Sequence, residues 1–302
     1  MIKKGIVLFG SIALALMVAG CSDGKTGAKD GANQGATVKV LKKPGSVKEL
    51  RNIGGTKTIT LANGAMVTWI QDNVGEKMMP RSLFSDASDS LYNSLNMPAG
   101  IPASVSTFLV RVNGKNLLFD AGFGAFGGQM LNRLLALGVT PDEISSIYLT
   151  HFHMDHIAGL ISKDSSGNAA KMFKNAALYA GKVEYDAWMN SIPNNDMQKN
   201  VMGLYKNNLH LFEFGDELPN GVLAIDAIGH TPGHTAFQFA NLLVIGDLMH
   251  GYALQKDHPE ISSNYDMDKP KAAESRKRIM QYARDKKLLM AGMHLPPLGF
   301  VE

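Results

Sequence analysis

The sequence predicts a single α/β domain built from layers of strands and helices. Short apolar runs bounded by Gly, Pro or Asn, which are typical of buried strands, alternate with segments whose apolar residues recur at helical spacing. Two of the runs, residues 105–112 and 116–120, flank Asn113-Gly114, which favours a tight β-hairpin. The sequence has no internal repeat and no linker-like stretch after residue 37, so we expect one domain over residues 38–302.

Residues 1–20 are predicted to be a signal peptide. Lys3 and Lys4 precede an apolar run over residues 6–18, which is shorter than the ~20 residues that a membrane-spanning helix needs. The run ends in Val18-Ala19-Gly20-Cys21, which resembles the lipobox of bacterial lipoproteins. We therefore expect cleavage before Cys21 and a lipid on its thiol; a short N-terminal core helix is the alternative.

Residues 21–37 are predicted to be a flexible tether. They are rich in Gly, Ala, Lys, Asp and Asn and have no apolar period. The lipid on Cys21 is expected to anchor the domain to the bacterial cell envelope, at the outer membrane or the periplasmic face. Cys21 is the only cysteine of the chain, which excludes internal disulfide bonds.

The charge balance argues against nucleic acid as a partner. The chain has 30 basic and 27 acidic side chains, and removing residues 1–20 takes away two lysines and no acidic residue, so the formal net charge falls from +3 to +1. No block of Lys and Arg with interleaved aromatic residues is present. We therefore expect a small-molecule substrate, and the sequence leaves open whether the protein forms a homodimer.

The remaining elements follow in chain order. A short helix is predicted to begin after Thr140, because Thr140 can cap it, Pro141 suits its first position and Glu143 lies three residues after the cap. A strand over residues 146–149 is predicted to follow it. Further apolar runs predict buried strands at residues 177–180, 209–214, 222–228, 236–239, 242–245 and 288–291. Helical spacing predicts helices at residues 129–137, 183–189, 197–206 and 269–284.

A cluster of polar residues follows the strand at residues 146–149 and reads Thr150-His151-Phe152-His153-Met154-Asp155-His156. In extended backbone alternate side chains share a side, so His151, His153 and Asp155 can converge. We expect the turn that follows the strand to place His156 beside these residues. Three histidines and an aspartate would be costly to bury without a cation, so the cluster predicts a metal site. Nitrogen and carboxylate ligands without a thiolate favour zinc, with manganese, iron or cobalt as alternatives.

Further metal ligands are expected at strand ends elsewhere in the chain. Pro232 and Gly233 occupy the central positions of a predicted type II turn that presents His234, and His230 competes for the same role. Asp247 follows the strand at residues 242–245, and its two carboxylate oxygens can bridge two metals. His294 follows the strand at residues 288–291.

Together these motifs resemble the metallo-β-lactamase superfamily. The resemblance rests on residues 151–156, Gly229-His-Thr-Pro-Gly-His-Thr235, Gly246-Asp247 and His294, and it covers roughly residues 58–302. Within the superfamily, residues 229–235, 246–249 and 291–296 are most similar to the methyl parathion hydrolase-like subgroup, whose neighbours include lactonases.

The resemblance implies a four-layer αβ/βα sandwich that holds two metal ions. One metal would be bound by His151, His153, His234 and Asp247, and the other by Asp155, His156, His294 and Asp247. It also implies aromatic residues around the leaving group, for which Phe126 and Trp188 lie in similar local contexts; a place in the core is the alternative for both. We further expect His250 to reach the pocket as a substrate or outer contact and Asp120 to orient a ligand histidine.

The expected activity is metal-dependent hydrolysis. A hydroxide that bridges the two metals would attack an ester, lactone or phosphotriester-type bond of a small molecule, with Asp155 accepting a proton. A β-lactam hydrolase and a thioesterase of the glyoxalase II type are alternatives on the same fold. A lipoprotein that binds metal without turnover is the alternative from a different class.

Overall fold

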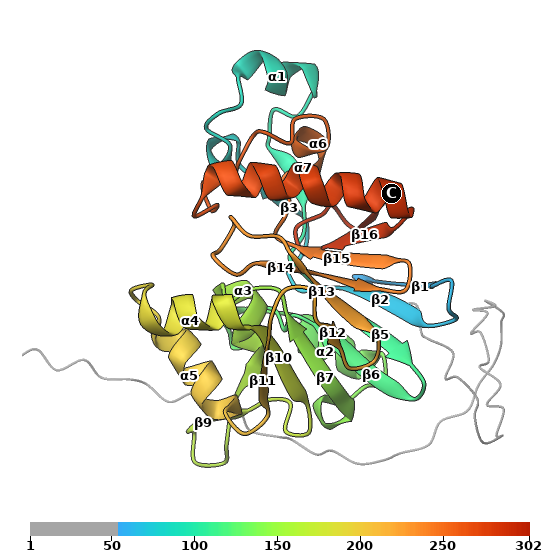
Figure 1. Cartoon of the computed structure of the whole chain (residues 1–302), viewed down its shortest axis with the longest axis vertical. Coiled ribbons are helices and arrows are strands. Elements are labelled where there is room, and N and C mark those ends of the chain that lie inside the picture. Colours follow the sequence, from blue (N-terminus) through green and yellow to red (C-terminus); the bar gives the residue numbers. More distant parts are fainter. Residues whose placement is uncertain (1–53) are drawn as a thin grey trace, which may run out of the picture. The chain divides into compact units, whose positions relative to one another are not determined.

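The computed structural model describes residues 54–302 of the chain (Figure 1). These residues fall within one unit of the chain, Glu49–Glu302. The predicted signal peptide, Cys21 and the tether over residues 21–37 lie outside the described residues and stay predictions. Within residues 54–302, no helix combines the length and the apolar character needed to cross a membrane.

A seven-stranded mixed sheet forms the first half of the fold. In spatial order its strands are β1 (Thr56–Thr60), β2 (Met66–Gln71), β5 (Ser106–Val112), β6 (Lys115–Phe119), β7 (Ile144–Leu149), β10 (Ala177–Gly181) and β11 (Leu209–Phe212). Strands β6, β7, β10 and β11 run parallel to one another. The connections between these parallel strands contain helices α2 (Met130–Ala136), α3 (Met154–Ile157), α4 (Lys182–Asn190) and α5 (Asp196–Tyr205).

A six-stranded sheet forms the second half. Its strands are, in spatial order, β12 (Glu217–Leu218), β13 (Val222–Asp226), β14 (Thr235–Phe239), β15 (Leu242–Gly246), β16 (Leu289–Gly292) and β17 (Phe300–Val301). The long helix α7 (Lys269–Lys286) lies in the connection between the parallel strands β15 and β16.

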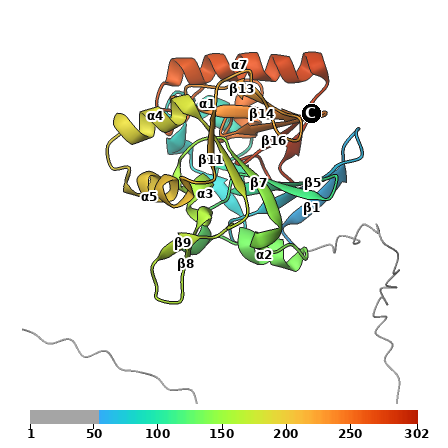
Figure 2. The same cartoon turned by 60° about the horizontal axis from the view of Figure 1, so that its bottom comes forward.

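The two sheets pack face to face, and helices cover both outer sides. Between the sheets, the rings of Phe119 in β6 and Phe237 in β14 have centroids 5.8 Å apart. On the outer face of the seven-stranded sheet, Leu118 belongs to a second core with Leu134 of α2. A third core joins the outer face of the six-stranded sheet to Ile279 of α7. Figures 1 and 2 show α7 and α5 on opposite outer sides, so the predicted αβ/βα sandwich is confirmed.

The position of each sheet between two layers explains why its strands are apolar at successive residues. In β5, Phe108 and Val110 face the core between the sheets, whereas Leu109 faces the helix layer. A strand that is buried on both faces does not need the alternation of polar and apolar residues that a half-exposed strand shows. Each such side chain contributes roughly 1.5–3 kcal/mol when it is fully removed from water.

The local signals around the first predicted hairpin are confirmed. Asn113 and Gly114 have φ angles of 48° and 75°, as the turn between β5 and β6 requires. The backbone N–H of Thr140 donates to Glu143 Oε2 at 2.8 Å, but the helix that follows is a single 3-10 turn, Pro141–Glu143, rather than a longer helix. Other 3-10 turns lie at Arg81–Leu83, Gly124–Phe126 and Ala158–Leu160.

A small satellite core lies beside the main sheets. It contains the paired strands β3 (Lys77–Met79) and β4 (Ile101–Ala103) together with buried residues such as Phe84, Tyr92 and Leu254. Helices α1 (Asp89–Ser94) and α6 (Tyr252–Gln255) contribute to it. A second small hairpin pairs β8 (Ile161–Lys163) with β9 (Ala169–Lys171). These short pairs were not expected from the sequence, because strands of three residues are too short to show a periodic pattern.

Candidate metal centre

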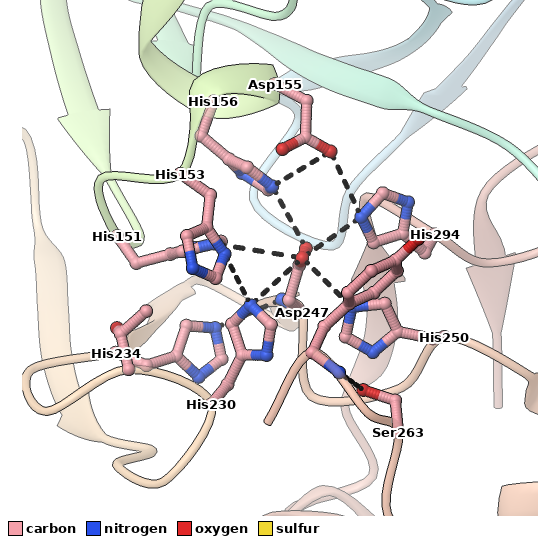
Figure 3. Close-up of polar contacts among 12 residues, drawn as sticks. His151, His153, Asp155, His156, His230, His234, Asp247, His250, Ser263 and His294 are labelled. Carbon is pink, nitrogen blue, oxygen red and sulfur yellow. Dashed lines mark hydrogen bonds and ion pairs between the residues drawn. The ribbon is translucent and has the colours of Figure 1, made fainter. Parts of the chain in front are cut away.

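Seven predicted or competing ligands meet at one edge of the sandwich (Figure 3). His151 and His153 follow the end of β7, and Asp155 and His156 lie in the short helix α3. Asp247 and His294 follow β15 and β16, which are parallel and therefore end at the same edge of their sheet. The last member is His230, in the loop between β13 and β14.

These side chains form two groups whose ligand atoms lie within 4.8 Å of one another. The first contains His151, His153, His230 and Asp247, and the second contains Asp155, His156, Asp247 and His294. Asp247 belongs to both: its Oδ2 lies 3.0 Å from His294 Nε2 and 3.3 Å from His230 Nε2, and its Oδ1 lies 3.2 Å from His156 Nε2. A carboxylate in this position can bridge two cations.

The donor atoms of the two groups fit divalent cations. His156 Nε2 and Asp247 Oδ1 are buried and lie 3.2 Å apart, but neither makes a hydrogen bond of good geometry, although buried polar atoms are nearly always paired. His153 Nδ1 lies 3.0 Å from His151 Nε2 and 2.9 Å from His230 Nε2, so ring nitrogens of three histidines converge on one point. Imidazole and carboxylate donors without sulfur suit zinc and allow other transition metals.

In the first group the pKa values of His151 and His153 favour the neutral form, whereas Asp247 and Asp266 outweigh burial and raise the pKa of His230. Burial is the main cause that lowers the pKa of His153 to about 3 and that of His151 well below its usual value. Neutral imidazole is the form that binds a metal. In the second group burial opposes protonation of His294, but Asp247 and Asp155 outweigh it and raise its pKa to about 10. A cation that binds there must therefore displace a proton.

His234 was expected in the first group, and the structure corrects this expectation. Its ring is fully buried, but Nδ1 donates to the carbonyl of Ala227 at 2.9 Å and Nε2 accepts from the backbone N–H of Asp247 at 3.0 Å. Both ring nitrogens are therefore occupied within the protein. His230, four residues earlier, takes the place in the ligand group.

The turn before His234 also differs from the expected type II turn. Gly233 does not have a positive φ angle, so the backbone conformation does not require a glycine at this position. It is required by packing, because a Cβ atom at Gly233 would lie 2.2 Å from the backbone nitrogen of Glu184. The loop therefore rests directly on the first turn of α4.

Glu184 joins the two loops that carry the first ligand group. Its Oε1 accepts from the backbone N–H of Phe152, at 2.9 Å, and from Trp188 Nε1, at 2.6 Å. Its Oε2 accepts from Thr231 Oγ1 and from the backbone N–H of Gly233, each at 2.8 Å. Burial raises the pKa of Glu184, and these hydrogen bonds partly offset that shift. Sequence patterns do not reveal this role of Glu184, because a glutamate in a helix is usually exposed.

Replacing Glu184 with glutamine is expected to lower the free energy of unfolding by about 1–3 kcal/mol. Glutamine keeps the shape but replaces one acceptor oxygen with an NH₂ group, which leaves two buried donors without an acceptor. Denaturation with urea would measure the change, and Glu274→Gln, at an exposed position of α7, is the control. Equal unfolding free energies for the two variants would contradict this role for Glu184.

A second set of contacts orients the ligand histidines from behind. His156 Nδ1 donates to Asp120 Oδ2 at 2.7 Å, the contact expected for Asp120. His230 Nδ1 donates to Asp266 Oδ1 at 3.0 Å, and His294 Nδ1 donates to the carbonyl of Ser104 at 2.9 Å. Such contacts determine which nitrogen of each ring faces the metal.

Asp266 is itself held in place by buried contacts that the sequence analysis did not identify. Its Oδ2 lies 3.2 Å from Arg276 Nη2 and accepts from the backbone N–H of Ser263 at 3.0 Å. Burial opposes ionisation of Asp266, but its hydrogen bond with His230 and nearby positive charges lower its pKa to about 2. Asp266 therefore remains ionised beside Nδ1 of His230.

A pocket of about 330 Å³ opens onto both ligand groups. Its lining residues outside the groups are Lys77, Met79, Val105, Phe123, Met154, His250 and Tyr265. His250 therefore reaches the pocket, as expected. It is buried, and its Nε2 lies 3.2 Å from Asp247 Oδ2.

The two aromatic residues expected around the leaving group lie elsewhere. Phe126 is 61% exposed and lines a separate pocket, while Phe123, at the other side of the same 3-10 turn, lines the pocket of the metal centre. Trp188 is buried, and its ring packs edge-on against His153 with centroids 5.9 Å apart, but it does not line the pocket. Both expectations rested on neighbouring sequence, which does not determine the direction of a side chain.

The αβ/βα sandwich and the shared-carboxylate site at its edge define a metal-dependent hydrolase. The chain belongs to the metallo-beta-lactamase superfamily, whose family model matches residues 100–294.

Curated relatives match part of the chain. Exodeoxyribonuclease WalJ of Streptococcus pneumoniae is 26% identical over 180 residues, which cover 55% of this chain and 61% of that protein. Hydroxyacylglutathione hydrolase of Aeromonas salmonicida is 27% identical over 162 residues, covering 53% of this chain and 51% of that protein. The chain thus spans about half to three-fifths of the length of these relatives.

Solved structures match more of the chain. The dizinc quorum-quenching lactonase AidC, in complex with the product N-hexanoyl-L-homoserine, is 25% identical with a TM-score of 0.71 and covers 82% of this chain and 92% of its own. The hydrolase AbOPH of the β-lactamase superfamily is 27% identical with a TM-score of 0.70, covering 83% of this chain and 93% of its own.

Proposed function

We propose that this protein is a dizinc hydrolase of the methyl parathion hydrolase-like subgroup, which cleaves an ester, lactone or phosphotriester-type bond in a small molecule. The observation that carries the proposal is the pocket of about 330 Å³, whose mainly apolar wall opens onto both ligand groups. A volume of this size suits a small organic substrate. The likeness to a dizinc lactonase and to the hydrolase AbOPH supports the same class of reaction.

The ligand residues would hold two cations, one in each group. His151, His153 and His230 would hold one cation, Asp155, His156 and His294 would hold the other, and Asp247 would bridge them. Two divalent cations bound there would supply a water of lowered pKa as nucleophile and would polarise the oxygen of the scissile bond. Asp120, Asp266 and the carbonyl of Ser104 keep the rings oriented for this task.

Asp155 is the residue best placed to accept a proton from the attacking water. It lines the pocket, it is 19% exposed, and its Oδ2 lies 3.3 Å from His294 Nε2. Burial would raise the pKa of Asp155, but His156 and His294 outweigh burial and hold it below its usual value. The ionised carboxylate has a second oxygen, Oδ1, that can receive a proton while Oδ2 faces the histidines of the ligand group.

His250 is proposed to contact the substrate. Its ring nitrogens make no hydrogen bond of good geometry among the described residues, although Nε2 lies 3.2 Å from Asp247 Oδ2, and its ring stacks on His294 with centroids 4.9 Å apart. Burial lowers the pKa of His250 to about 4, so it is neutral and can donate one hydrogen bond to an oxygen of the substrate.

The test compares zinc-loaded and chelator-treated protein on an aryl ester, an aryl lactone, paraoxon, nitrocefin, a glutathione thioester and single-stranded DNA. We expect hydrolysis of the ester, lactone or phosphotriester only with zinc, and a rate lower by about 10²–10³-fold in Asp155→Ala. Asp257→Ala, at a position that is 63% exposed and away from the pocket, is the control. Turnover confined to nitrocefin, the thioester or DNA would contradict the proposal, as would equal rates with and without zinc.

A further inference from the structure

The wall of the pocket at the metal centre includes a lysine that neither ligand group uses. Lys77 and Met79 line the pocket, whereas Met78 between them is exposed. This alternation follows from the strand conformation of β3, in which residues two apart point to the same side. The side chain of Lys77 therefore lies on the pocket side of β3.

The position of Lys77 relative to the ligand groups follows from strand pairing. Lys77 lies opposite Ala103 in the β3–β4 pair. The next residue, Ser104, accepts the hydrogen bond from His294 Nδ1, and Val105 lines the pocket. Lys77 thus lies on the His294 side of the pocket, beside the reacting centre rather than within it.

Lys77 has no anionic partner in the part of the chain that the structure describes. No carboxylate lies within ion-pair distance of its ammonium group, and no hydrogen bond from it is present. The acidic residues that line the pocket, Asp155 and Asp247, both belong to the histidine groups. The remaining wall is largely apolar or aromatic, which leaves few protein groups to compensate the charge.

We propose that Lys77 binds a carboxylate of the substrate at a position away from the scissile bond. The inference rests on the proposed function and adds a substrate class to it: small esters or lactones that carry a carboxylate on the acyl chain. The apolar wall formed by Met79, Val105 and Phe123 would contact the chain between the two ends. An ammonium on a flexible stem suits a single carboxylate whose distance from the reacting group can vary.

The experiment compares 4-nitrophenyl hexanoate with mono-4-nitrophenyl adipate, whose chains end in a methyl group and a carboxylate. Lys77→Met is expected to raise KM for the adipate ester about fivefold, the scale of a partly exposed ion pair, without changing kcat or the KM for the hexanoate ester. Lys77→Arg is expected to retain the preference for the adipate ester. Lys57→Met, at an exposed position of β1, removes the same charge away from the pocket and is the control.

Binding of free adipate, measured by calorimetry on the zinc-loaded protein, separates this proposal from the proposed function. If neither ester is cleaved but Lys77→Met weakens adipate binding about fivefold, the proposed function fails and the carboxylate site stands. If esters are cleaved and Lys77→Met affects both equally, or leaves adipate binding unchanged, the carboxylate site is overturned. Thermal unfolding of each variant would show that the loss does not come from a failure to fold.

Discussion

Replacing Asp247 with asparagine is expected to remove both metal ions and to lower the rate of hydrolysis by about 10³-fold or more. The carboxylate is 2% exposed and contacts His156, His230 and His294, so it is common to the two ligand groups. Burial alone would raise the pKa of Asp247, but neighbouring histidines, His156 first, hold it well below the usual value. Asparagine has the same shape but carries no charge and offers one oxygen instead of two.

Elemental analysis for bound zinc, with turnover of the ester in the same sample, would measure this effect. The control is Asp257→Asn, because Asp257 is 63% exposed and its ion-pair partner, Lys256, lies outside the pocket of the metal centre. Asp247→Asn that retains two equivalents of zinc would show that the ligand groups are not joined through this carboxylate. Full activity with one equivalent would instead point to a single catalytic metal.

The pair of variants His230→Ala and His234→Ala is expected to separate a metal ligand from a structural histidine. His230→Ala should lower zinc affinity and hydrolysis by about 10²-fold or more, because His230 Nε2 faces the first ligand group. His234→Ala should retain zinc better but lower the free energy of unfolding by about 1–3 kcal/mol for each group left unpaired, the carbonyl of Ala227 and the N–H of Asp247.

Each of these two variants is the control for the other, because the residues differ by four positions in the same loop and both are buried. Zinc titration with a chromogenic chelator and denaturation with urea would supply the two readouts. Loss of zinc in His234→Ala together with full retention in His230→Ala would restore the assignment drawn from the sequence. The structure predicts that His234→Ala retains more zinc than His230→Ala. Burial is the main cause that lowers the pKa of His234 to about 3, so its ring is neutral, and both ring nitrogens are hydrogen-bonded within the protein.

Most of the fold could be predicted from the sequence because its signals are local. The Asn113-Gly114 turn, the apolar runs and the helical spacing each act over a few residues, and the longer strands β5, β6, β7, β10, β11 and β13 to β16 lie close to the bounds expected from the sequence, whereas the short strands β8, β9 and β12 were not expected. Strands β1 to β4 were not assigned. They carry either a short run or a mixed pattern, and β3 and β4 are ordered by packing with Phe84, Tyr92 and Leu254 in the satellite core.

The candidate site was predictable where its residues are contiguous and uncertain where they come from distant loops. Residues 151–156 supply four ligands from one strand end, as expected, but Asp155 and His156 lie in helix α3 rather than in extended backbone, so they join the second group while His151 and His153 join the first. Phe123 and Phe126 have the same residue type and nearly the same neighbours, yet only Phe123 lines the pocket. The direction of each ring depends on the packing of the 3-10 turn, which no local pattern encodes.

From its sequence alone the chain reveals the ligand types, the strand ends that carry them and the family whose motifs they resemble. Only the tertiary structure places His230 rather than His234 in the ligand group, sets Asp266 and Ser104 against the outer nitrogens of the ligand rings and places Lys77 in the wall of the pocket. The physical reason is that residue type and spacing determine local structure, whereas the position of a ligand side chain depends on contacts between segments that are distant in sequence. Glu184 joins two loops far apart in sequence, and that contact determines how each loop presents its histidine.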